Sequence, residues 1–416
     1  MEQRATFSIH TLGCKVNQYE SEKIRETLLL AGYCEVPFGA PAQVQIINTC
    51  TVTHTADRKS RQKIRSALRA APGGTVVVTG CAVEHDSPGI KTLDERLVIV
   101  PQKDKEKIAF TLTPPAITSP EVHHSPRTRA MLKIGDGCDH FCSYCIVPHV
   151  RGRIRSRLPD EVEEEAEKLA GRGFREIVLT AIHLGAYGRD LPGGESLPGL
   201  IDRLARRFPS LRIRLSSIEP QDFSEDLLEV MERHKALCRH IHLPLQHASP
   251  SVLERMGRGY TIEEYQRILE RITARIPDVA LTSDIIVGFP GETEADFTAL
   301  FNFIDKACFF RIHVFKFSPR PGTPAAHFPG KVREDVKQER SALLIKKGVE
   351  HGERFCRRFI GETLEVLAEG SSGGMLHGLA GNYIKVRFRG KKRDLGRIIP
   401  VRISNALGSE LSGSVT

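Results

Sequence analysis

Three cysteines lie within eight residues of one another near the middle of the chain. Cys138, Cys142 and Cys145 follow the spacing C-x3-C-x2-C. A loop this short can surround one face of an iron–sulfur cube and supply one thiolate to each of three irons. The fourth iron would then keep an open coordination position, which is typical of a catalytic metal site. Because a strand-like segment at 130–134 precedes the triplet, we expect the loop to follow a strand.

Two simpler interpretations of the triplet are a structural zinc site and a disulfide with one free thiol. His140 or His149 could supply a fourth zinc ligand. Closely spaced thiols in an intracellular chain favour a metal over a disulfide. Both alternatives stay open at this stage beside the iron–sulfur interpretation.

The first 112 residues alternate strands with helices, which predicts an open parallel α/β sheet. The expected strands are 6–9, 44–49 and 75–79, with helices at 20–31 and 56–70 and a loop at 11–17. Cys14, Cys50 and Cys81 each come directly after one of these strands. Because the carboxyl ends of parallel strands meet at one edge of a sheet, we expect these three thiols to converge. They predict a second three-thiolate cluster site, the alternative being three buried structural cysteines.

Both cysteine sets lie in phrases that resemble known families. The triplet, with Tyr144 just before its third cysteine, resembles the radical S-adenosylmethionine (SAM) enzymes, in which the open iron binds SAM and the aromatic residue lies against it. Segments 11–21, 48–53 and 79–82 resemble the N-terminal domain of the methylthiotransferases, and this resemblance spans nearly the whole chain. Gly-Cys-Lys-Val-Asn and Asn-Thr-Cys-Thr-Val-Thr most resemble the branch that acts on threonylcarbamoyladenosine in tRNA, the MtaB type.

Strand and helix signals alternate six times between 128 and 358, which predicts a partial (βα)6 barrel. The expected strands are 130–134, 175–180, 211–216, 239–243, 279–286 and 309–315. The expected helices are 159–172, 197–208, 225–235, 261–276 and 294–307. Polar or glycine-containing phrases follow these strands, and the alternative for each is an ordinary loop or helix cap. The resemblance implies that Ser217, Glu219, Gln246 and Gly288 contact SAM together with Tyr144.

The pattern changes to short alternating strands between glycine turns after residue 358, which predicts a small five-stranded β-barrel. It resembles the TRAM domain, an RNA-binding module. The expected RNA-binding cations are Lys385, Arg387, Arg389, Lys391, Lys392 and Arg393. Alternation places several of them on one exposed face suited to a phosphate backbone, the alternative being a solvated strand face.

The expected domains are an N-terminal methylthiotransferase domain at 1–112, a proline-rich linker at 113–127, the barrel at 128–358 and the TRAM-like barrel at 359–416. The net charge of +9 fits an anionic macromolecular partner. With no apolar run of about 18 residues and no visible signal peptide, we expect a cytoplasmic protein without a membrane span. The remaining cysteines, Cys34, Cys238, Cys308 and Cys356, match no ligand spacing and are expected to be core or partly buried thiols.

The resemblance implies a radical SAM tRNA methylthiotransferase that uses two 4Fe–4S clusters and SAM. One cluster, on the triplet, would reduce SAM to a radical that removes hydrogen from C2 of the adenine next to the anticodon. The other, on Cys14, Cys50 and Cys81, would carry the sulfur that is methylated and transferred. The implied partners are the tRNA anticodon stem–loop, an electron donor and a sulfur source. The alternatives are the same chemistry on isopentenyladenosine tRNA or a ribosomal protein aspartate, and a non-catalytic iron–sulfur RNA-binding sensor.

Overall fold

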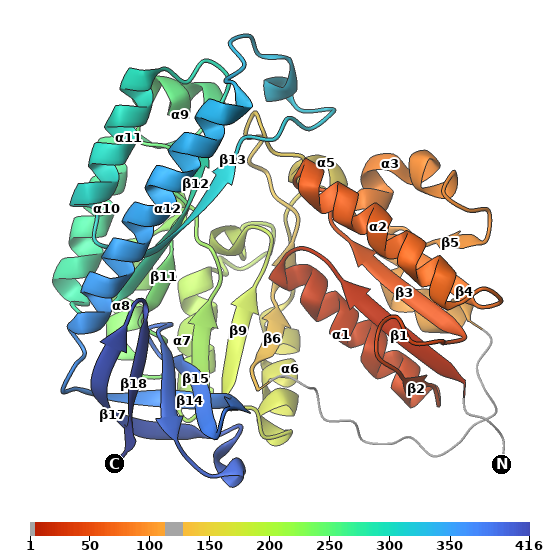
Figure 1. Cartoon of the computed structure of the whole chain (residues 1–416). Helices are drawn as coiled ribbons and strands as arrows, with labels where there is room; N and C mark the ends of the chain where they lie inside the picture. Colours follow the sequence, from red (N-terminus) through yellow and green to blue (C-terminus); the bar gives the residue numbers. More distant parts are fainter. Residues whose placement is uncertain (1–4, 113–127) are drawn as a thin grey trace. The chain divides into compact units, whose positions relative to one another are not determined.

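The computed structural model describes residues 5–112 and 128–416 (Figure 1). Contacts divide the chain into two compact units. Unit 1 comprises Met1–Ser125, Asp136–Arg153 and Ser318–Ala326, and unit 2 comprises Pro126–Gly135, Ile154–Phe317 and His327–Thr416. The predicted linker at 113–127 lies outside the described residues. The domain boundaries expected from the sequence remain predictions, because units defined by contacts need not coincide with domains that fold independently.

Unit 1 is built on a parallel sheet with the strand order β2-β1-β3-β4-β5. The strands are β1 (Thr6–Thr11), β2 (Cys34–Glu35), β3 (Val44–Thr49), β4 (Thr75–Gly80) and β5 (Leu97–Ile99). All six residues of β3 are buried, as expected for a central strand covered on both faces. The open parallel sheet predicted from the sequence is therefore confirmed.

Helices of unit 1 pack around this sheet. They are α1 (Lys15–Leu30), α2 (His54–Ala70), α3 (Cys81–Lys91) and α4 (Ile108–Thr111), with the 3-10 helix η1 (Gln102–Lys107), while the short helix α5 (Val147–Arg151) contacts α3. Ile46 packs in one core with Leu28 of α1, whereas Ile47 packs in the other with Ile64 of α2. Successive side chains of a strand point to opposite faces, so neighbouring residues of β3 serve two cores.

The predicted start of the first helix was wrong. The sequence indicated a loop at 11–17 and a helix from residue 20, but α1 begins at Lys15. The reason is tertiary, because Val16 is buried and the amide side chain of Asn17 donates to the Leu12 and Thr49 carbonyls. These contacts stabilise a first turn that carries no apolar periodicity of its own.

Unit 2 contains six consecutive parallel strands. They are β6 (Ala130–Lys133), β9 (Glu176–Thr180), β10 (Arg212–Leu215), β11 (His240–His242), β12 (Ala280–Val287) and β13 (Phe309–Lys316). They form two ladders, β6-β9-β10 and β11-β12-β13, and isolated bridges such as Ser217↔His242 continue from the first to the second. The partial (βα)6 barrel is confirmed. The short strands β7 (Gly135–Asp136) and β8 (Arg155–Ser156) complete this part of the chain.

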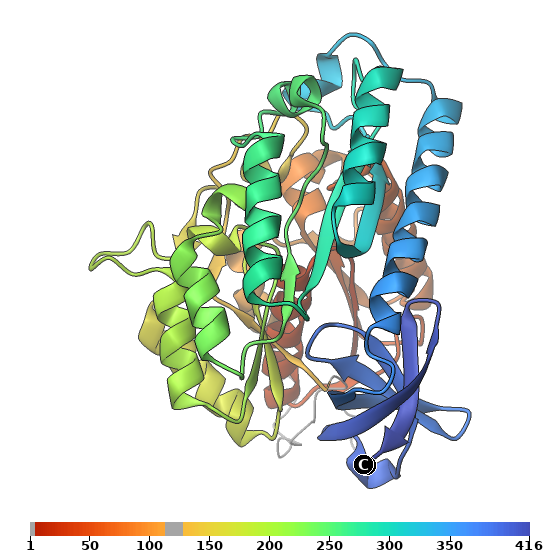
Figure 2. The same cartoon turned by 90° about the vertical axis from the view of Figure 1, so that its left-hand side faces the viewer.

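Helices cover the outer face of these strands, and Figure 2 shows α10, α11 and α12 in front of them. The helices are α6 (Pro159–Gly171), α7 (Leu197–Arg207), α8 (Glu225–Arg233), α9 (Pro250–Met256), α10 (Ile262–Arg275), α11 (Glu294–Lys306) and α12 (Glu334–Arg357). Short 3-10 helices are η2 (Leu184–Ala186), η3 (Pro220–Asp222) and η4 (Pro324–His327). Hydroxyl caps fix several starts, and Thr261 forms a capping box with Glu264. No helix in the described part of the chain is long and apolar enough to cross a membrane.

The last 54 residues form a closed barrel with the strand order β14-β15-β16-β18-β17. The strands are β14 (Thr363–Ser372), β15 (Met375–Ala380), β16 (Lys385–Arg389), β17 (Ile398–Leu407) and β18 (Glu410–Val415), and η5 (Lys392–Asp394) lies between β16 and β17. The five-stranded barrel is confirmed. Its core includes Phe388, together with Phe355 of α12, Phe359 just after that helix and Phe310 of β13. The two barrels of unit 2 therefore meet in this hydrophobic cluster, which is separate from the main core of the partial barrel.

Candidate metal centres

The triplet loop lies in unit 1, directly before α5. The Cys145 amide donates to the Cys142 carbonyl over 3.0 Å, and the Cys138 amide donates to the Gly152 carbonyl over 3.0 Å. The His140 amide points at Cys138 Sγ over 3.4 Å, as backbone amides do around a thiolate. Cys142 is buried, whereas Cys138 and Cys145 are partly exposed. The local hydrogen bonds thus hold three thiols around one compact turn.

The second cysteine set converges at the carboxyl edge of the unit 1 sheet. Cys14 caps α1, Cys50 follows β3 directly and Cys81 is the first residue of α3 after β4. Burial, together with the neighbouring thiols of Cys81 and Cys14, raises the pKa of Cys50 to about 11. A side chain on Gly13 would place its Cβ 2.9 Å from Cys50 Sγ, so only glycine fits beside this thiol. The structure brings the three predicted cysteines together.

Both sets fit a multi-iron cluster better than a single metal ion. A tetrahedral zinc with Zn–S bonds near 2.3 Å holds its sulfur ligands about 3.8 Å apart. Across the described residues, the one group of three ligand atoms within 4.8 Å of each other contains no cysteine. Thiolates on separate irons stand farther apart than this, since each binds a different corner of the cube. All ten cysteines are free thiols, so the disulfide interpretation finds no support.

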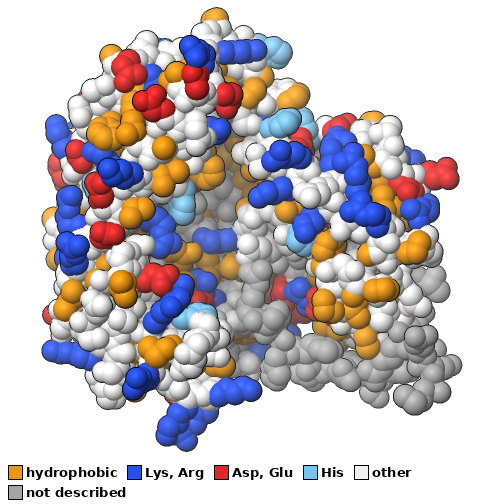
Figure 3. Space-filling view, in the orientation of Figure 1, with side chains coloured by type: hydrophobic (Ala, Val, Ile, Leu, Met, Phe, Trp, Pro, Cys, Tyr) orange, Lys and Arg blue, Asp and Glu red, His pale blue; other side chains and the backbone are white. Residues whose placement is uncertain are grey.

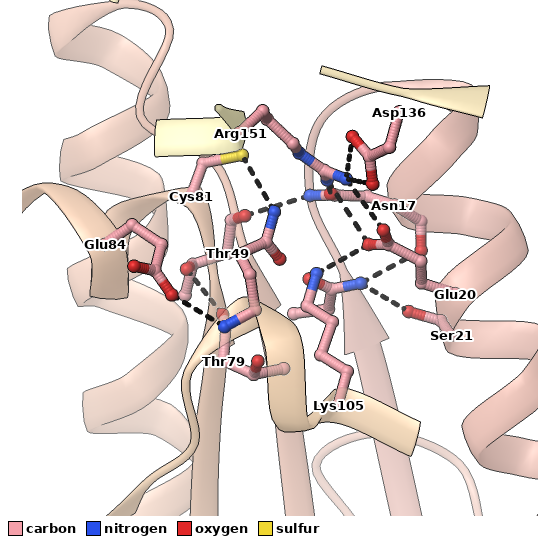
Figure 4. A network of polar contacts seen from close by, with 12 residues as sticks. Asn17, Glu20, Ser21, Thr49, Thr79, Cys81, Glu84, Lys105, Asp136 and Arg151 are labelled. Atoms are coloured by element: carbon pink, nitrogen blue, oxygen red, sulfur yellow. Dashed lines mark hydrogen bonds and ion pairs between the residues drawn. The ribbon is translucent and has the colours of Figure 1, made fainter. Parts of the chain in front are cut away.

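A buried polar network joins α1, which follows Cys14, to residues on both sides of the triplet (Figure 4). Arg151, the last residue of α5, contacts Glu20 Oε1 at 2.7 Å and Asp136 Oδ2 at 3.1 Å, and also donates to Asn17 Oδ1. Lys105 contacts the other Glu20 oxygen at 2.6 Å. Asn17 and Glu20 lie in α1 just after Cys14, whereas Arg151 and Asp136 flank the triplet. The network therefore fixes the triplet loop against the sheet edge that carries Cys14.

Cys81 lies where the carboxyl edge of the sheet contacts the segment that follows the triplet. Its side chain packs against Ile146 and Val150 of the segment that follows the triplet. Burial raises the pKa of the Cys81 thiol, and the neighbouring Arg151 guanidinium opposes that rise. A cation beside a buried thiol favours its deprotonated, metal-binding form. Sequence reasoning missed Arg151, whose partners in α1 lie 131 or more positions away along the chain.

The segment 318–326 joins unit 1 from far along the chain. The Arg320 side chain is 2% exposed and donates to Thr51 Oγ1 and Asp57 Oδ2, each over 2.7 Å. The Ala325 amide donates to the Ser143 carbonyl over 2.8 Å. The sequence predicted only a rigid loop leaving the barrel here. The structure shows that this loop supports both the residue after Cys50 and the triplet loop.

The residues predicted to contact SAM belong to both units of the chain. Tyr144 is part of the triplet loop in unit 1. Ser217 is exposed after β10, and Glu219 pairs with Arg258. Gln246 adopts a φ of 63° and exchanges backbone hydrogen bonds with β12, which marks a backbone strained at the carboxyl end of the strands. Contact of these residues with SAM stays a prediction.

Gly288 has structural reasons to be glycine. Its φ is 73°, and a Cβ there would lie 2.2 Å from the Lys337 side chain. Its amide donates to Glu292 Oε2 over 2.6 Å. A contact between Gly288 and SAM also stays a prediction.

The predicted RNA-binding cations lie on the C-terminal barrel. Lys385, Arg387 and Arg389 point outward on β16, whereas Val386 and Phe388 are buried, so the predicted alternation is present. Glu410 pairs with Lys385 at 2.7 Å and lies 3.5 Å from Arg387. Lys392 and Arg393 are exposed in η5, and Lys391 is exposed directly before it. Figure 3 shows Lys and Arg side chains over the lower part of unit 2, where this barrel lies.

The remaining cysteines follow the sequence expectation in three cases. Cys238 and Cys356 are buried, and Cys34 is partly buried. Cys308 is exposed, contrary to that expectation, because it lies in the turn between α11 and β13 rather than within either element. It serves below as a control position.

Comparisons with known proteins agree with this architecture. Residues 132–304 match the radical SAM superfamily, and residues 6–100 match the uncharacterized protein family UPF0004. The chain is 39% identical to the threonylcarbamoyladenosine tRNA methylthiotransferase MtaB of Bacillus subtilis, covering 97% of this chain and 94% of that protein. It is 37% identical to MtaB of Thermotoga maritima, covering 96% and 94%. It is 34% identical to the tRNA-2-methylthio-N6-dimethylallyladenosine synthase of Syntrophobacter fumaroxidans, covering 98% and 95%.

The chain belongs to the radical SAM methylthiotransferase family.

A solved structure shares the fold of this methylthiotransferase at low identity. The radical SAM methyltransferase TsrM from Kitasatospora setae aligns with a TM-score of 0.58 and 15% identity, covering 78% of this chain and 75% of that one. The likeness supports the sheet-plus-barrel arrangement alone. In the methylthiotransferase the two cysteine sets, the polar network and the 318–326 segment all belong to unit 1.

Proposed function

We propose that this chain converts threonylcarbamoyladenosine, next to the anticodon of tRNA, into its 2-methylthio derivative. The observation that carries the proposal is the joining of two cysteine sets in one compact unit through Arg151. The relatives named MtaB are 37–39% identical to the chain over nearly its whole length, and those named dimethylallyladenosine synthase are 33–34% identical. The polar threonylcarbamoyl substrate is therefore favoured over the apolar one.

Cys138, Cys142 and Cys145 would hold one 4Fe–4S cluster, and Cys14, Cys50 and Cys81 a second one. When bound, the clusters and SAM supply the radical and sulfur chemistry, for which side chains alone have no equivalent. The chain's own residues enclose and orient these groups. Cys50 and Cys81 are 4% and 5% exposed, which keeps water away from the buried thiolates.

Charged side chains of unit 1 lie next to the Cys81 thiol. Arg151 lies beside Cys81, and Lys105 is buried in the same network at Glu20. The nearby guanidinium favours the deprotonated, metal-binding form of that thiol. Glu20 and Asp136 in turn neutralise the Arg151 guanidinium, so the network stays paired throughout.

RNA binding is proposed for the C-terminal barrel. Arg387 and Arg389 present exposed guanidinium groups on one face of β16, where they can contact a phosphate backbone. The target adenine must leave the base stack to expose its C2 atom, as base-modifying enzymes require. An electron donor and a sulfur source complete the proposed set of partners, and the cytoplasm, where tRNA is modified, is the proposed location.

Two single variants test the proposed division of labour between the cysteine sets. The reconstituted full chain is given reductant, SAM and an anticodon stem–loop carrying threonylcarbamoyladenosine. We expect Cys142→Ala to abolish both 5′-deoxyadenosine and methylthio product. Cys14→Ala should retain 5′-deoxyadenosine formation yet yield no methylthio product. Cys308→Ala, which replaces an exposed thiol in unit 2, serves as the control.

Two outcomes would contradict the proposal. Methylthio product from Cys14→Ala would remove the second set from the reaction. Absence of 5′-deoxyadenosine from the wild-type chain would instead favour the non-catalytic RNA-binding sensor. A parallel stem–loop carrying dimethylallyladenosine distinguishes the second candidate substrate, which the 33–34% identical relatives suggest.

A further inference from the structure

The inner face of the barrel carries polar side chains that the proposed function has not used. Strand register places Asp284 of β12 beside His313 of β13, and His242 of β11 beside Thr282 of β12. Ile285, which follows Asp284, belongs to the core beneath the helices. Because side chains alternate across a strand, Asp284 and its neighbours point into the barrel interior.

These side chains form a compact cluster. His242 Nε2 lies 3.2 Å from Asp284 Oδ2, and His242 Nδ1 lies 2.9 Å from Thr282 Oγ1. One polar atom from each of His242, Asp284 and His313 lies within 4.8 Å of the other two. We call these three residues the inner triad. They supply a carboxylate acceptor between two imidazoles.

The inner triad lies between buried side chains on one side and solvent on the other. Thr282 and His240, bonded to each other over 3.0 Å, are 2% and 3% exposed. Tyr383, from the turn between β15 and β16, stacks on the His240 ring with centroids 4.4 Å apart. The Asp284 side chain is 29% exposed, and His313 is exposed although it lies within its strand. The inner triad therefore has a buried polar floor and a solvent-accessible face, from which a ligand can reach Asp284 and His313.

We propose that the inner triad binds the N6 substituent of the substrate nucleoside, an inference that rests on the proposed function. A threonylcarbamoyl group carries urea N–H groups, a hydroxyl and a carboxylate. Asp284 has acceptor capacity beyond the oxygen that faces His242, so it accepts from N–H or O–H groups. The imidazole of His313 donates to the carboxylate.

The same groups would discriminate against a dimethylallyl substituent. That substituent has no hydrogen-bonding atoms, so burying it against Asp284 would strip water from the carboxylate without replacing it. A site built to hydrogen-bond its substrate rejects an analogue that lacks the polar group far more strongly than an apolar pocket rejects a missing methylene. Strands β11, β12 and β13, which carry the inner triad, would thus determine which N6 substituent the enzyme accepts.

The test compares two stem–loops and three variants of the reconstituted full chain. One stem–loop carries threonylcarbamoyladenosine, and the other carries its methyl ester, which removes the carboxylate charge. The variants are His313→Ala, His313→Gln and the control His234→Ala. His234 forms a His–Asp pair with Asp202, 2.7 Å apart, on the helical side of the barrel. The readouts are kcat/KM for methylthio product and the Kd of each RNA.

We expect the wild type to lose about tenfold in kcat/KM with the ester, since a hydrogen bond to a charged group is lost. With the natural nucleoside, kcat/KM of His313→Ala should be about tenfold below that of the wild type. With the ester, kcat/KM of His313→Ala should be less than about twofold below that of the wild type. His313→Gln, which keeps a donor, should recover part of the loss. His234→Ala should behave as the wild type.

Four results would overturn the inference. His313→Ala could lower kcat/KM by the same factor for both RNAs, which indicates a structural role, or have no effect. Metal analysis could also find one divalent ion per chain in addition to the cluster iron. Loss of that ion in His313→Ala would make the inner triad a metal site. An added stem–loop with dimethylallyladenosine separates the two kinds of failure: a wild type that modifies it but not threonylcarbamoyladenosine would reject the proposed function itself.

Discussion

Arg151 shows how one buried side chain can link distant parts of unit 1. Its side chain is 1% exposed, and those of Glu20 and Asp136 are 11% and 13% exposed. Taking charges out of water is costly, and such a network is stable only while every member keeps its partner. Arg151 is therefore the residue that joins α1 to both sides of the triplet loop, beside the support that the 318–326 segment gives.

We expect Arg151→Met to lower the free energy of unfolding by about 3 kcal/mol, because Glu20 and Asp136 lose the guanidinium that they share, although Lys105 still pairs with Glu20. Urea denaturation of the apo chain, followed by fluorescence of labelled unit 1, measures this change. Arg153→Met is the matched control, since Arg153 is 73% exposed and lies 3.5 Å from Asp139. The control should change stability by about 1 kcal/mol or less. Equal losses in both variants would contradict the assigned role.

His247 makes stability depend on pH in unit 2. Burial lowers the pKa of its imidazole to about 3, although Asp296 acts in the opposite direction. In the unfolded chain the group titrates near 6.5, so below that pH the unfolded state binds a proton that the folded state does not. Stability is therefore lost as the pH falls from about 6.5 toward 3, by at most about 1.4 kcal/mol per pH unit for this group.

We expect His247→Gln to flatten the pH dependence of unfolding between pH 6.5 and 4.5. Glutamine keeps an acceptor for the Ser249 amide, which His247 Nδ1 accepts over 2.9 Å. Burial also lowers the pKa of His10 and His351, so part of the slope should remain. Denaturation midpoints across this pH range measure the effect, with the exposed His54→Gln as control. An unchanged slope in His247→Gln would contradict the assignment.

At the scale of elements, a buried carboxylate holds the two barrels of unit 2 together. Glu176 is fully buried on β9 and contacts Arg212 and Arg214 of β10. Arg212 also donates to the Leu379 carbonyl, and Arg214 to the Gly381 carbonyl, in the C-terminal barrel. Burial would raise the pKa of Glu176, but the two guanidinium groups outweigh it and lower the pKa to about 2. At neutral pH the Glu176 carboxylate is therefore ionised and pairs with both arginines where the two barrels meet.

We expect Glu176→Gln to loosen the C-terminal barrel, because two buried guanidinium groups lose their counter-charge. Limited trypsin digestion should then release a fragment that begins in α12, and hydrogen exchange in β15 should accelerate. Glu163→Gln is the matched control, as Glu163 also pairs with two arginines, Arg203 and Arg207, but on the helical surface. Unchanged digestion in Glu176→Gln would refute the docking role.

The elements differ in how far the sequence predicts them. The barrel strands follow from long alternations of apolar strands and amphipathic helices, and the cysteine sets follow from spacing and strand ends. The sequence predicted a five-stranded barrel but did not locate β15 and β18, because Gly378 and Gly413 interrupt their alternation where a Cβ would meet a neighbouring carbonyl. Arg320 and Arg151 were missed for another reason. Their roles come from partners far away in sequence, which no local pattern reveals.

At the scale of the whole molecule, chain order and spatial grouping differ. The triplet loop and the 318–326 segment lie within the stretch expected to be one barrel, yet both belong to unit 1. The sequence predicted both cluster sites and the RNA-binding barrel, but it did not predict that one unit holds every proposed cluster ligand. That grouping is what the proposed two-cluster chemistry requires.

The central claim is tested most directly by mass spectrometry of tRNA nucleosides from cells with and without this gene. The account predicts that 2-methylthio-threonylcarbamoyladenosine disappears in the deletion strain and that its precursor without the methylthio group accumulates. Reintroducing the wild-type gene should restore the modification, whereas the Cys50→Ala gene should not. Unchanged 2-methylthio-threonylcarbamoyladenosine, with loss of the dimethylallyl analogue instead, would contradict the account.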